Sequence, residues 1–290
     1  MDLLTTPEHR FEALGFDFPT RRVEVGGVGI FTVDVGAGPV VLLMHGEPTW
    51  SYLYRKMIPP LVAAGLRVLA PDLVGFGRSD KPASIVDHTF AGHVAWMTGW
   101  FDAMEVDDVT LFGQDWGGLI GLRILANRPE RFSRLVVSNT GLPTGDQTMS
   151  DAFLAWQEFA RTSPEFAVGS IVAGGVVNPL TPETIAAYDA PFPDERFKAA
   201  PRAMPSLVPT RPDDPEAEAN RRAWQTLSSW EGGVLTLFSD SDPITAGGER
   251  PFQKMMPGAR GQPHRTITRA GHFVQEDAGV ELAGALIAWL

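Results

Sequence analysis

Apolar residues in this chain come in short runs, and the spacing between them changes in a regular way. Several runs are continuous, which is typical of strands buried on both faces of a sheet; they occupy residues 40–44, 68–70, 109–112, 135–137 and 234–238. Between runs, segments such as residues 93–104 place apolar side chains at helical spacing. Residues 22–25 and 30–35 alternate around Gly26 and Gly27, which predicts an antiparallel hairpin. This alternation predicts an α/β fold with a mostly parallel sheet flanked by helices.

The pattern changes after Thr140. From about residue 142 to residue 226 no strand is indicated, and helical stretches are broken by repeated prolines. A helical insertion in an α/β chain usually covers the sheet edge at which such folds bind ligands. We therefore predict a core domain formed by residues 1–141 and 227–290 and an inserted helical cap domain at 142–226. The alternative is a second structural domain with no part in the site.

Composition narrows the class of protein. The 290 residues are 44% hydrophobic, enough for one large domain, and the net charge of −11 argues against nucleic acid or an anionic membrane as a partner. The absence of cysteine excludes disulfides, thiolate catalysis and cysteine-ligated metals. No run of about 18 apolar residues is present, and the N-terminus lacks the apolar segment of a secretion signal. These features predict a soluble cytoplasmic protein, with a monomer as the default state.

The run Gly113-Gln114-Asp115-Trp116-Gly117-Gly118 is the first candidate for chemistry. It lies between the strand predicted at 109–112 and a helical pattern at 119–125. Its spacing is that of a nucleophile elbow, with aspartate where the better-known G-x-S-x-G form has serine. A carboxylate is ionised at neutral pH and attacks carbon without help from a base. We therefore predict Asp115 as the nucleophile; its alternative role is that of a helix N-cap.

Other polar loops follow the predicted strands. One contains His45 and Glu47, a second is Ser239-Asp240-Ser241-Asp242-Pro243, and Gly271-His272-Phe273 lies near the C-terminus. The chain order of nucleophile, acid and histidine is that of α/β-hydrolases. We predict His272 as the base and Asp242 as the acid that orients it, with Asp240 as the competing acid.

An aspartate nucleophile predicts a reaction in two steps. Attack on an sp3 carbon leaves an alkyl ester on Asp115, and His272 must then activate water to hydrolyse it. Water attacks the carboxyl carbon, so an oxyanion forms that backbone N–H groups must hold. The elbow arrangement predicts that the N–H groups of Trp116 and Glu47 form this oxyanion hole. Whether the Glu47 carboxylate also positions the water is left open by the sequence.

The leaving group distinguishes the reactions that share this chemistry. An epoxide oxygen needs an acidic hydroxyl, usually from tyrosine, whereas a halide needs only N–H donors in a dry pocket. Trp116 adjoins the nucleophile and carries an indole N–H donor, and residues 142–226 add Trp156 and Trp224. The chain has three tyrosines, of which Tyr188 alone lies in that segment. The sequence therefore favours a halide.

Four motifs carry a family resemblance that extends over nearly the whole chain. They are HGEPTWSYLYR at 45–55, DLVGFGRSDKP at 72–82, GQDWGG at 113–118 and GHFVQE at 271–276. Together they resemble the haloalkane dehalogenases of the α/β-hydrolase superfamily. The resemblance implies an eight-stranded sheet and hydrolysis of small haloalkanes to an alcohol and a halide ion, with water as the second substrate and with no cofactor or metal.

A finer resemblance concerns the halide site. Glu47, together with an acid after the later strand, is similar to the subgroup with an Asp-His-Asp triad that acts on small dihaloalkanes. In that subgroup the cap supplies the second halide-binding tryptophan, and the segment Phe153-Leu154-Ala155-Trp156 resembles the one that does so. The resemblance therefore implies that Trp116 and Trp156 bind the halide. It also implies a substrate pocket lined by Phe153, Met204, Pro205 and Val208.

Three rival functions share parts of this pattern. An epoxide hydrolase would use the same Asp-His-Asp chemistry, but usually carries histidine where this chain has Gln114. A haloacid or fluoroacetate dehalogenase would be expected to carry arginine at position 116 to hold a carboxylate. A non-catalytic binding protein with this fold would not need an intact triad.

Overall fold

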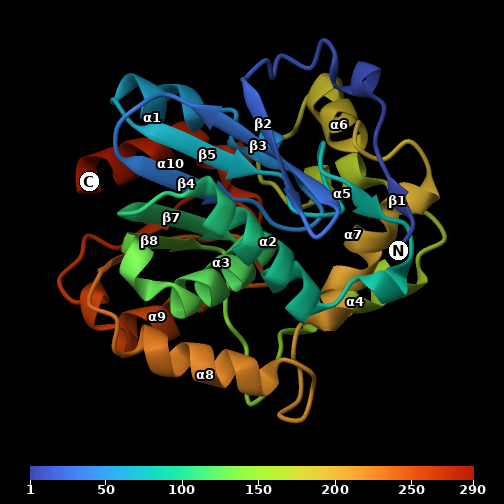
Figure 1. Ribbon diagram of the computed structural model, residues 1–290. Helices are drawn as coiled ribbons and strands as arrows, with labels where there is room; N and C mark the ends of the chain where they lie inside the picture. The colour runs from blue at the N-terminus through green and yellow to red at the C-terminus, as the bar shows by residue number, and fades with distance from the viewer.

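A sheet of eight strands runs through the molecule in the computed structural model, which describes residues 1–290 (Figure 1). The strands lie in the order β10-β9-β8-β7-β4-β5-β3-β2. Only β3 runs antiparallel to its neighbours, β2 and β5, so the sheet is mostly parallel and the predicted hairpin is confirmed. The strand bounds are β2 Thr20–Val25, β3 Val28–Val35, β4 Val40–Met44, β5 Arg67–Pro71, β7 Val109–Gln114, β8 Phe132–Ser138, β9 Gly233–Ser239 and β10 Arg265–Ile267.

The central strands are apolar on both faces because helices cover both faces. All five residues of β4 and all six of β7 are buried, as expected for parallel strands at the centre of an α/β sheet. A separate two-stranded sheet pairs β1 (Leu3–Leu4) with β6 (Lys81–Pro82). The sequence pattern did not predict this small sheet, since two-residue strands show no periodicity.

Helices flank the sheet in two groups. Helices α1 (Ile58–Ala63) and α10 (Val274–Trp289) pack together, and α2 (Phe90–Met104), α3 (Trp116–Asn127) and α8 (Ala217–Leu227) form the second group (Figure 1). Helix α9 (Glu249–Met255) packs beside β9. None of these helices combines the length and hydropathy that a membrane-spanning segment requires.

No strand lies between Ser138 and Gly233, in agreement with the pattern of the sequence. Helices α4 (Asp151–Thr162), α5 (Val168–Gly174), α6 (Pro182–Asp189) and α7 (Ala199–Ala203) gather beyond one end of the sheet (Figure 1). Ser150 and Thr181 cap α4 and α6 by accepting a backbone N–H. Helix α8 also falls in this segment but packs against α3.

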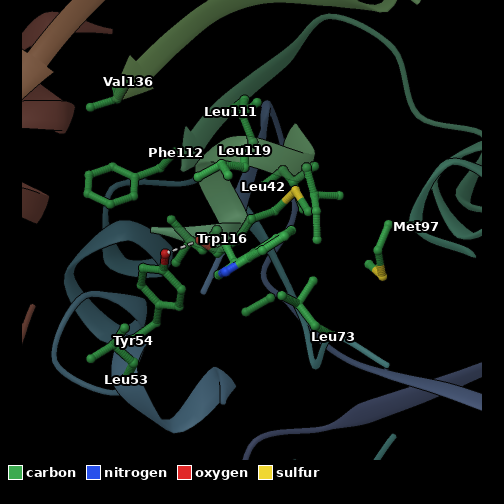
Figure 2. Close-up of a cluster of buried hydrophobic side chains, with 14 of the residues drawn as sticks. Leu42, Leu53, Tyr54, Leu73, Met97, Leu111, Phe112, Trp116, Leu119 and Val136 are labelled. Atoms are coloured by element: carbon green, nitrogen blue, oxygen red, sulfur yellow. Dashed lines mark hydrogen bonds between the residues drawn. The ribbon is translucent and has the colours of Figure 1, made fainter. Parts of the chain in front are cut away.

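The core beneath the predicted site joins the sheet to α3. Figure 2 shows Leu42 of β4 and Leu111 of β7 close to Leu119 of α3. In the same view the hydroxyl of Tyr54 donates to the carbonyl oxygen of Met44 at 2.7 Å. This bond satisfies a buried carbonyl at the end of β4, where the Glu47 loop begins.

Candidate active site

Asp115 occupies the turn between β7 and α3. Its backbone has φ of 49° and ψ of −128°, a region that residues other than glycine rarely adopt. A Cβ on Gly46 would lie 2.2 Å from Asp115 Oδ1, and one on Gly117 would lie 2.0 Å from the Met44 carbonyl oxygen. Glycine at these positions therefore allows the strand, the loop after β4 and the helix to meet closely around the carboxylate.

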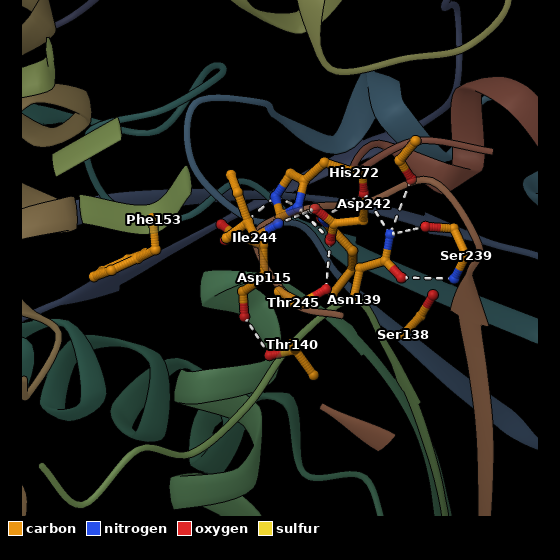
Figure 3. A network of polar contacts seen from close by, with 12 residues as sticks. Asp115, Ser138, Asn139, Thr140, Phe153, Ser239, Asp242, Ile244, Thr245 and His272 are labelled. Atoms are coloured by element: carbon orange, nitrogen blue, oxygen red, sulfur yellow. Dashed lines mark hydrogen bonds and ion pairs between the residues drawn. The ribbon is translucent and has the colours of Figure 1, made fainter. Parts of the chain in front are cut away.

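The contacts of Asp115 distinguish its two carboxylate oxygens. Oδ1 accepts the backbone N–H of Glu47 at 2.7 Å, whereas Oδ2 lies 3.5 Å from His272 Nε2. The backbone is held by the two residues that follow β8, because the Asp115 N–H donates to the carbonyl oxygen of Asn139 at 3.0 Å and the Thr140 hydroxyl donates to the Asp115 carbonyl oxygen at 2.7 Å (Figure 3). One oxygen is thus fixed by a backbone donor and the other faces an imidazole.

His272 lies between two aspartates. Its Nδ1 is 2.9 Å from Asp242 Oδ2, opposite the contact with Asp115. Burial alone would lower the pKa of His272, but the two carboxylates outweigh burial and raise the pKa well above its ordinary value. The carbonyl oxygen of His272 accepts bonds from the Asn139 and Gln114 amides at 3.0 and 3.1 Å. Both the charge and the position of the ring are therefore determined by neighbouring side chains.

The structure brings Asp242, and not Asp240, to the histidine. Asp242 also accepts the Ile244 N–H at 2.9 Å and the Thr245 hydroxyl. Burial acts to raise the pKa of Asp242, but the charge of His272 and these bonds lower it to about 2. Asp240 instead accepts backbone N–H groups of residues 269 and 270. Asp242 is thus an ionised partner for Nδ1, and Asp240 holds the loop that precedes His272.

The surroundings of the indole N–H groups distinguish the tryptophans that are candidates for halide binding. The indole of Trp224 donates to the Leu142 carbonyl oxygen at 2.8 Å and is therefore occupied. Trp116 and Trp156 both line the cavity beside Asp115, and the Trp156 indole interacts with the Glu47 carboxyl and acts to lower the pKa of that carboxyl. Trp116 packs edge-on against Phe90 at a centroid distance of 4.9 Å. Two indole side chains thus line the cavity, one from α3 and one from α4.

The Glu47 side chain is buried beside Asp115. Burial and, next, the charge of Asp115 raise its pKa well above the ordinary value, with a smaller opposing effect from His272 and Trp156. Its Oε1 atom is buried without a hydrogen-bond partner. The carboxyl therefore retains a free hydrogen-bonding atom at the site.

A cavity of about 870 Å³ opens above these residues, within the range of small-molecule sites. Its titratable lining side chains are Glu47, Asp115 and His272. Of the pocket residues implied by resemblance, Phe153, Pro205 and Val208 line it, whereas Met204 is fully buried and does not. Met204 and Pro205 begin one 3₁₀ turn (Met204–Leu207), in which consecutive side chains point in different directions.

Comparison with known proteins identifies the family. The α/β-hydrolase-fold model matches residues 39–243. Haloalkane dehalogenases of Psychrobacter cryohalolentis and Mycobacterium marinum are 50% and 49% identical to this chain over its whole length, covering 98% and 100% of those proteins. This chain belongs to the haloalkane dehalogenases. It is a hydrolase, as the motifs indicated.

Solved structures agree with this assignment. The haloalkane dehalogenase DpaA of Paraglaciecola agarilytica, described as tetrameric, superposes with a TM-score of 0.91 at 35% identity, covering 100% of this chain and 99% of that one. DatA of Agrobacterium tumefaciens gives a TM-score of 0.81 at 27% identity, with 96% and 97% covered. The eight-stranded α/β-hydrolase fold is therefore confirmed for this dehalogenase.

Sequence reasoning missed one residue that organises the dehalogenase site. Asn139 donates from Nδ2 to the carbonyl oxygens of Gly271 and His272, both at 3.0 Å, while its Oδ1 accepts the Ser239 N–H at 2.9 Å (Figure 3). It thus connects the ends of β8 and β9 to the histidine loop. Its position directly after a strand was the available signal. No group of three or more His, Asp or Glu side chains has a geometry suited to a metal ion.

Proposed function

We propose that this dehalogenase hydrolyses uncharged haloalkanes through a covalent ester on Asp115, with Trp116 and Trp156 holding the departing halide. In this proposal residues 142–226 are the cap that supplies Trp156 to a core formed by residues 1–141 and 227–290. One observation carries the proposal: Asp115 Oδ1 is held by a backbone N–H while Oδ2 faces both His272 and a cavity lined by the indoles of Trp116 and Trp156.

In the first half-reaction, Asp115 Oδ2 attacks the carbon that bears the halogen. A carbon–oxygen bond forms as the carbon–halogen bond breaks, and the halide leaves with the bonding electron pair. The indole N–H groups of Trp116 and Trp156 stabilise the negative charge that develops on it. This step needs an ionised carboxylate and no base.

In the second half-reaction, His272 Nε2 takes a proton from water, which attacks the carboxyl carbon of Asp115. The oxyanion forms on Oδ1, where the Glu47 N–H already donates at 2.7 Å. Trp116 is the first residue of α3, and its N–H lies in the first turn, where no intrahelical acceptor exists. Collapse breaks the bond to the alcohol oxygen, which takes the proton from His272, and leaves Asp115 as a carboxylic acid. Loss of its proton to solvent restores the carboxylate. The sum is haloalkane plus water giving alcohol, halide and a proton.

The charges around His272 support this order of events. In the free protein, Asp242 and Asp115 both stabilise the protonated ring and raise its pKa. Formation of the ester removes the charge of Asp115, so the pKa of His272 falls when a base is needed. Asp242 still holds Nδ1 and stabilises the imidazolium that forms.

The cavity disfavours the rival substrates. No tyrosine lines it: the hydroxyl of Tyr54 donates to a backbone carbonyl, and the hydroxyl of Tyr188 donates to Glu276. An epoxide oxygen would therefore lack the acidic hydroxyl that it needs. No lysine or arginine lines the cavity either, so a haloacid carboxylate would be buried without a counter-charge.

The proposal is tested by trapping the ester. Purified protein mixed with 1-bromobutane or 1,2-dibromoethane should release bromide and acidify the solution. His272→Phe with 1-bromobutane should release about one bromide per active site and gain a butyl group on the peptide that contains Asp115. Asp115→Ala is the matched control and should show neither event. Turnover of styrene oxide without bromide release, or turnover without a trapped ester, would overturn the proposal.

A further inference from the structure

Asp277 connects the histidine loop to the helical segment above the cavity. Its Oδ2 accepts the N–H of Gly271 at 2.9 Å and that of Val177 at 3.0 Å. Its Oδ1 accepts the backbone and side-chain N–H groups of Asn178, both at 2.8 Å. One carboxylate, half-buried in the first turn of α10, thus receives four donors from two segments nearly a hundred residues apart in the chain.

The two segments are also in direct contact. The Phe273 N–H points to the carbonyl oxygen of Gly175 at 3.3 Å. A Cβ on Gly271 would lie 2.4 Å from that carbonyl oxygen, and one on Gly175 would lie 2.6 Å from the Phe273 ring. Residues 175–178 and 271–273 therefore form one closely packed unit, with His272 inside it and Asp277 joining its two halves.

The remaining supports of the loop come from the core. Asn139 and Gln114 hold the carbonyl side of Gly271 and His272. Asp240 holds residues 269 and 270. Only Asp277 binds the N–H of Gly271, so it alone holds the donor side of the Ala270–Gly271 peptide, directly before the residue that precedes His272.

We propose that Asp277 is a positioning residue that holds His272 at its working distance from Asp115 by fastening the histidine loop to residues 177–178. The inference rests on the proposed function, in which His272 acts only on the ester. It assigns to Asp277 an effect on ester hydrolysis and none on ester formation.

The physical reason is the different geometric demand of the two steps. Ester formation uses Asp115, which is held by the Glu47 loop, Asn139 and Thr140, none of which contacts Asp277. Ester hydrolysis requires Nε2 to reach the carboxyl carbon through one water, so a small displacement of the loop is felt directly. A misplacement of about 1 Å in such a contact costs up to roughly a hundredfold in rate.

The test is Asp277→Asn in a single-turnover experiment with 1-bromobutane. The amide keeps the size of the side chain but replaces one acceptor oxygen with an NH2 donor. That donor then faces two N–H groups to which it cannot bond. The rate constant for loss of the butyl-enzyme, followed by mass spectrometry, should fall roughly ten- to a hundredfold, while the rate constant for bromide release in the first turnover stays within about twofold. Asn178→Ala, which removes one donor, should give a smaller loss of the same kind.

Asp214→Asn is the matched control. Asp214 is also half-buried and accepts backbone N–H groups, from Thr210 and Arg211, but does not contact the histidine loop. It should leave both rate constants within about twofold. The size of the bromide burst counts folded active sites, so partial unfolding of a variant lowers the burst without changing either rate constant.

Two outcomes overturn the inference. Unchanged loss of the butyl-enzyme in Asp277→Asn would show that Asp277 does not position His272. Equal slowing of both steps would show a general structural role. Failure of His272→Phe to trap any ester would refute the proposed function itself, which separates the two conclusions.

Discussion

The cavity has two walls, and different interactions hold them. The sheet wall carries Glu47, Asp115, Trp116 and His272 on loops and a helix start at the end of the sheet. Hydrogen bonds hold its polar groups, and His272 is only 7% exposed. The cap wall carries apolar side chains of α4 and α5, among them Phe159, which is 41% exposed.

Aromatic packing gives the cap wall its shape. Trp156 lies 5.7 Å from Phe159 and 5.8 Å from Phe166 between ring centroids. Apolar contacts of this kind tolerate substitution of similar volume, whereas a polar network loses its geometry when one member is removed. The comparison teaches that, in the proposed function, the polar network of the sheet wall carries the chemistry and the apolar cap wall shapes the space for the substrate.

The largest expected effect comes from Asp242 in the sheet wall. Asp242→Asn removes the charge that stabilises the imidazolium and lets an amide N–H favour the wrong tautomer, so ester hydrolysis should slow by roughly 10⁴-fold. Asp214→Asn, which contacts neither His272 nor the loop before it, should change the rate by less than about threefold. Loss of the butyl-enzyme after a single turnover with 1-bromobutane, followed by mass spectrometry, measures both. Equal losses would remove Asp242 from its assigned role.

Substitution of Trp116 in the sheet wall and of Trp156 in the cap wall allows a direct comparison, since each wall contributes one indole donor. Trp116→Phe should weaken bromide binding and slow carbon–bromine cleavage by roughly a hundredfold, because its position is fixed in the sheet wall. Trp156→Phe should cost less, because its helix is more exposed and can adjust. Quenching of intrinsic fluorescence by bromide reports binding. Trp224→Phe serves as the control, and a loss there larger than at Trp116 would contradict the assignment.

The pH dependence should follow the sheet wall alone. His272 must be neutral to accept a proton from water, so ester hydrolysis should speed up as pH rises through the pKa of His272 in the ester. In the free enzyme the charge of Asp115 helps to raise the pKa of His272, and formation of the ester removes that charge. The pKa that governs kcat should therefore lie below the pKa of His272 measured by NMR in the free enzyme. Phe153→Leu in the cap wall should leave this difference unchanged. Coincident pKa values in the two states would contradict the proposed order of charges.

The fold was predictable because its strongest signals are local. Residues 40–44 were predicted as a buried strand and form β4. The strand predicted at 109–112 extends by two residues to form β7. Asn139 and Asp277 were not predictable in this way. The Asn139 side chain acts on a residue 133 positions away, and Asp277 acts on one 100 positions away. Neither contact leaves a period or a spacing in the sequence.

The same limit applies to the residues above the cavity. Phe153 and Met204 were assigned together from resemblance, yet only Phe153 lines the cavity. Trp156 and Trp224 offer the same side chain, and the structure distinguishes them in that the Trp224 N–H is bound to a carbonyl oxygen. Hydrophobicity marks such residues as buried, but tertiary packing decides whether they face a core or a cavity.

The backbone of Asp115 has a consequence for protein engineering. Its φ of 49° suits glycine better than aspartate, and strain of this kind costs of order 1–3 kcal/mol. Asp115→Gly should therefore yield a folded protein with a higher melting temperature and no turnover. A library selected only for heat resistance would enrich inactive sequences at this position. Directed evolution of this chain must score activity in the same round as stability.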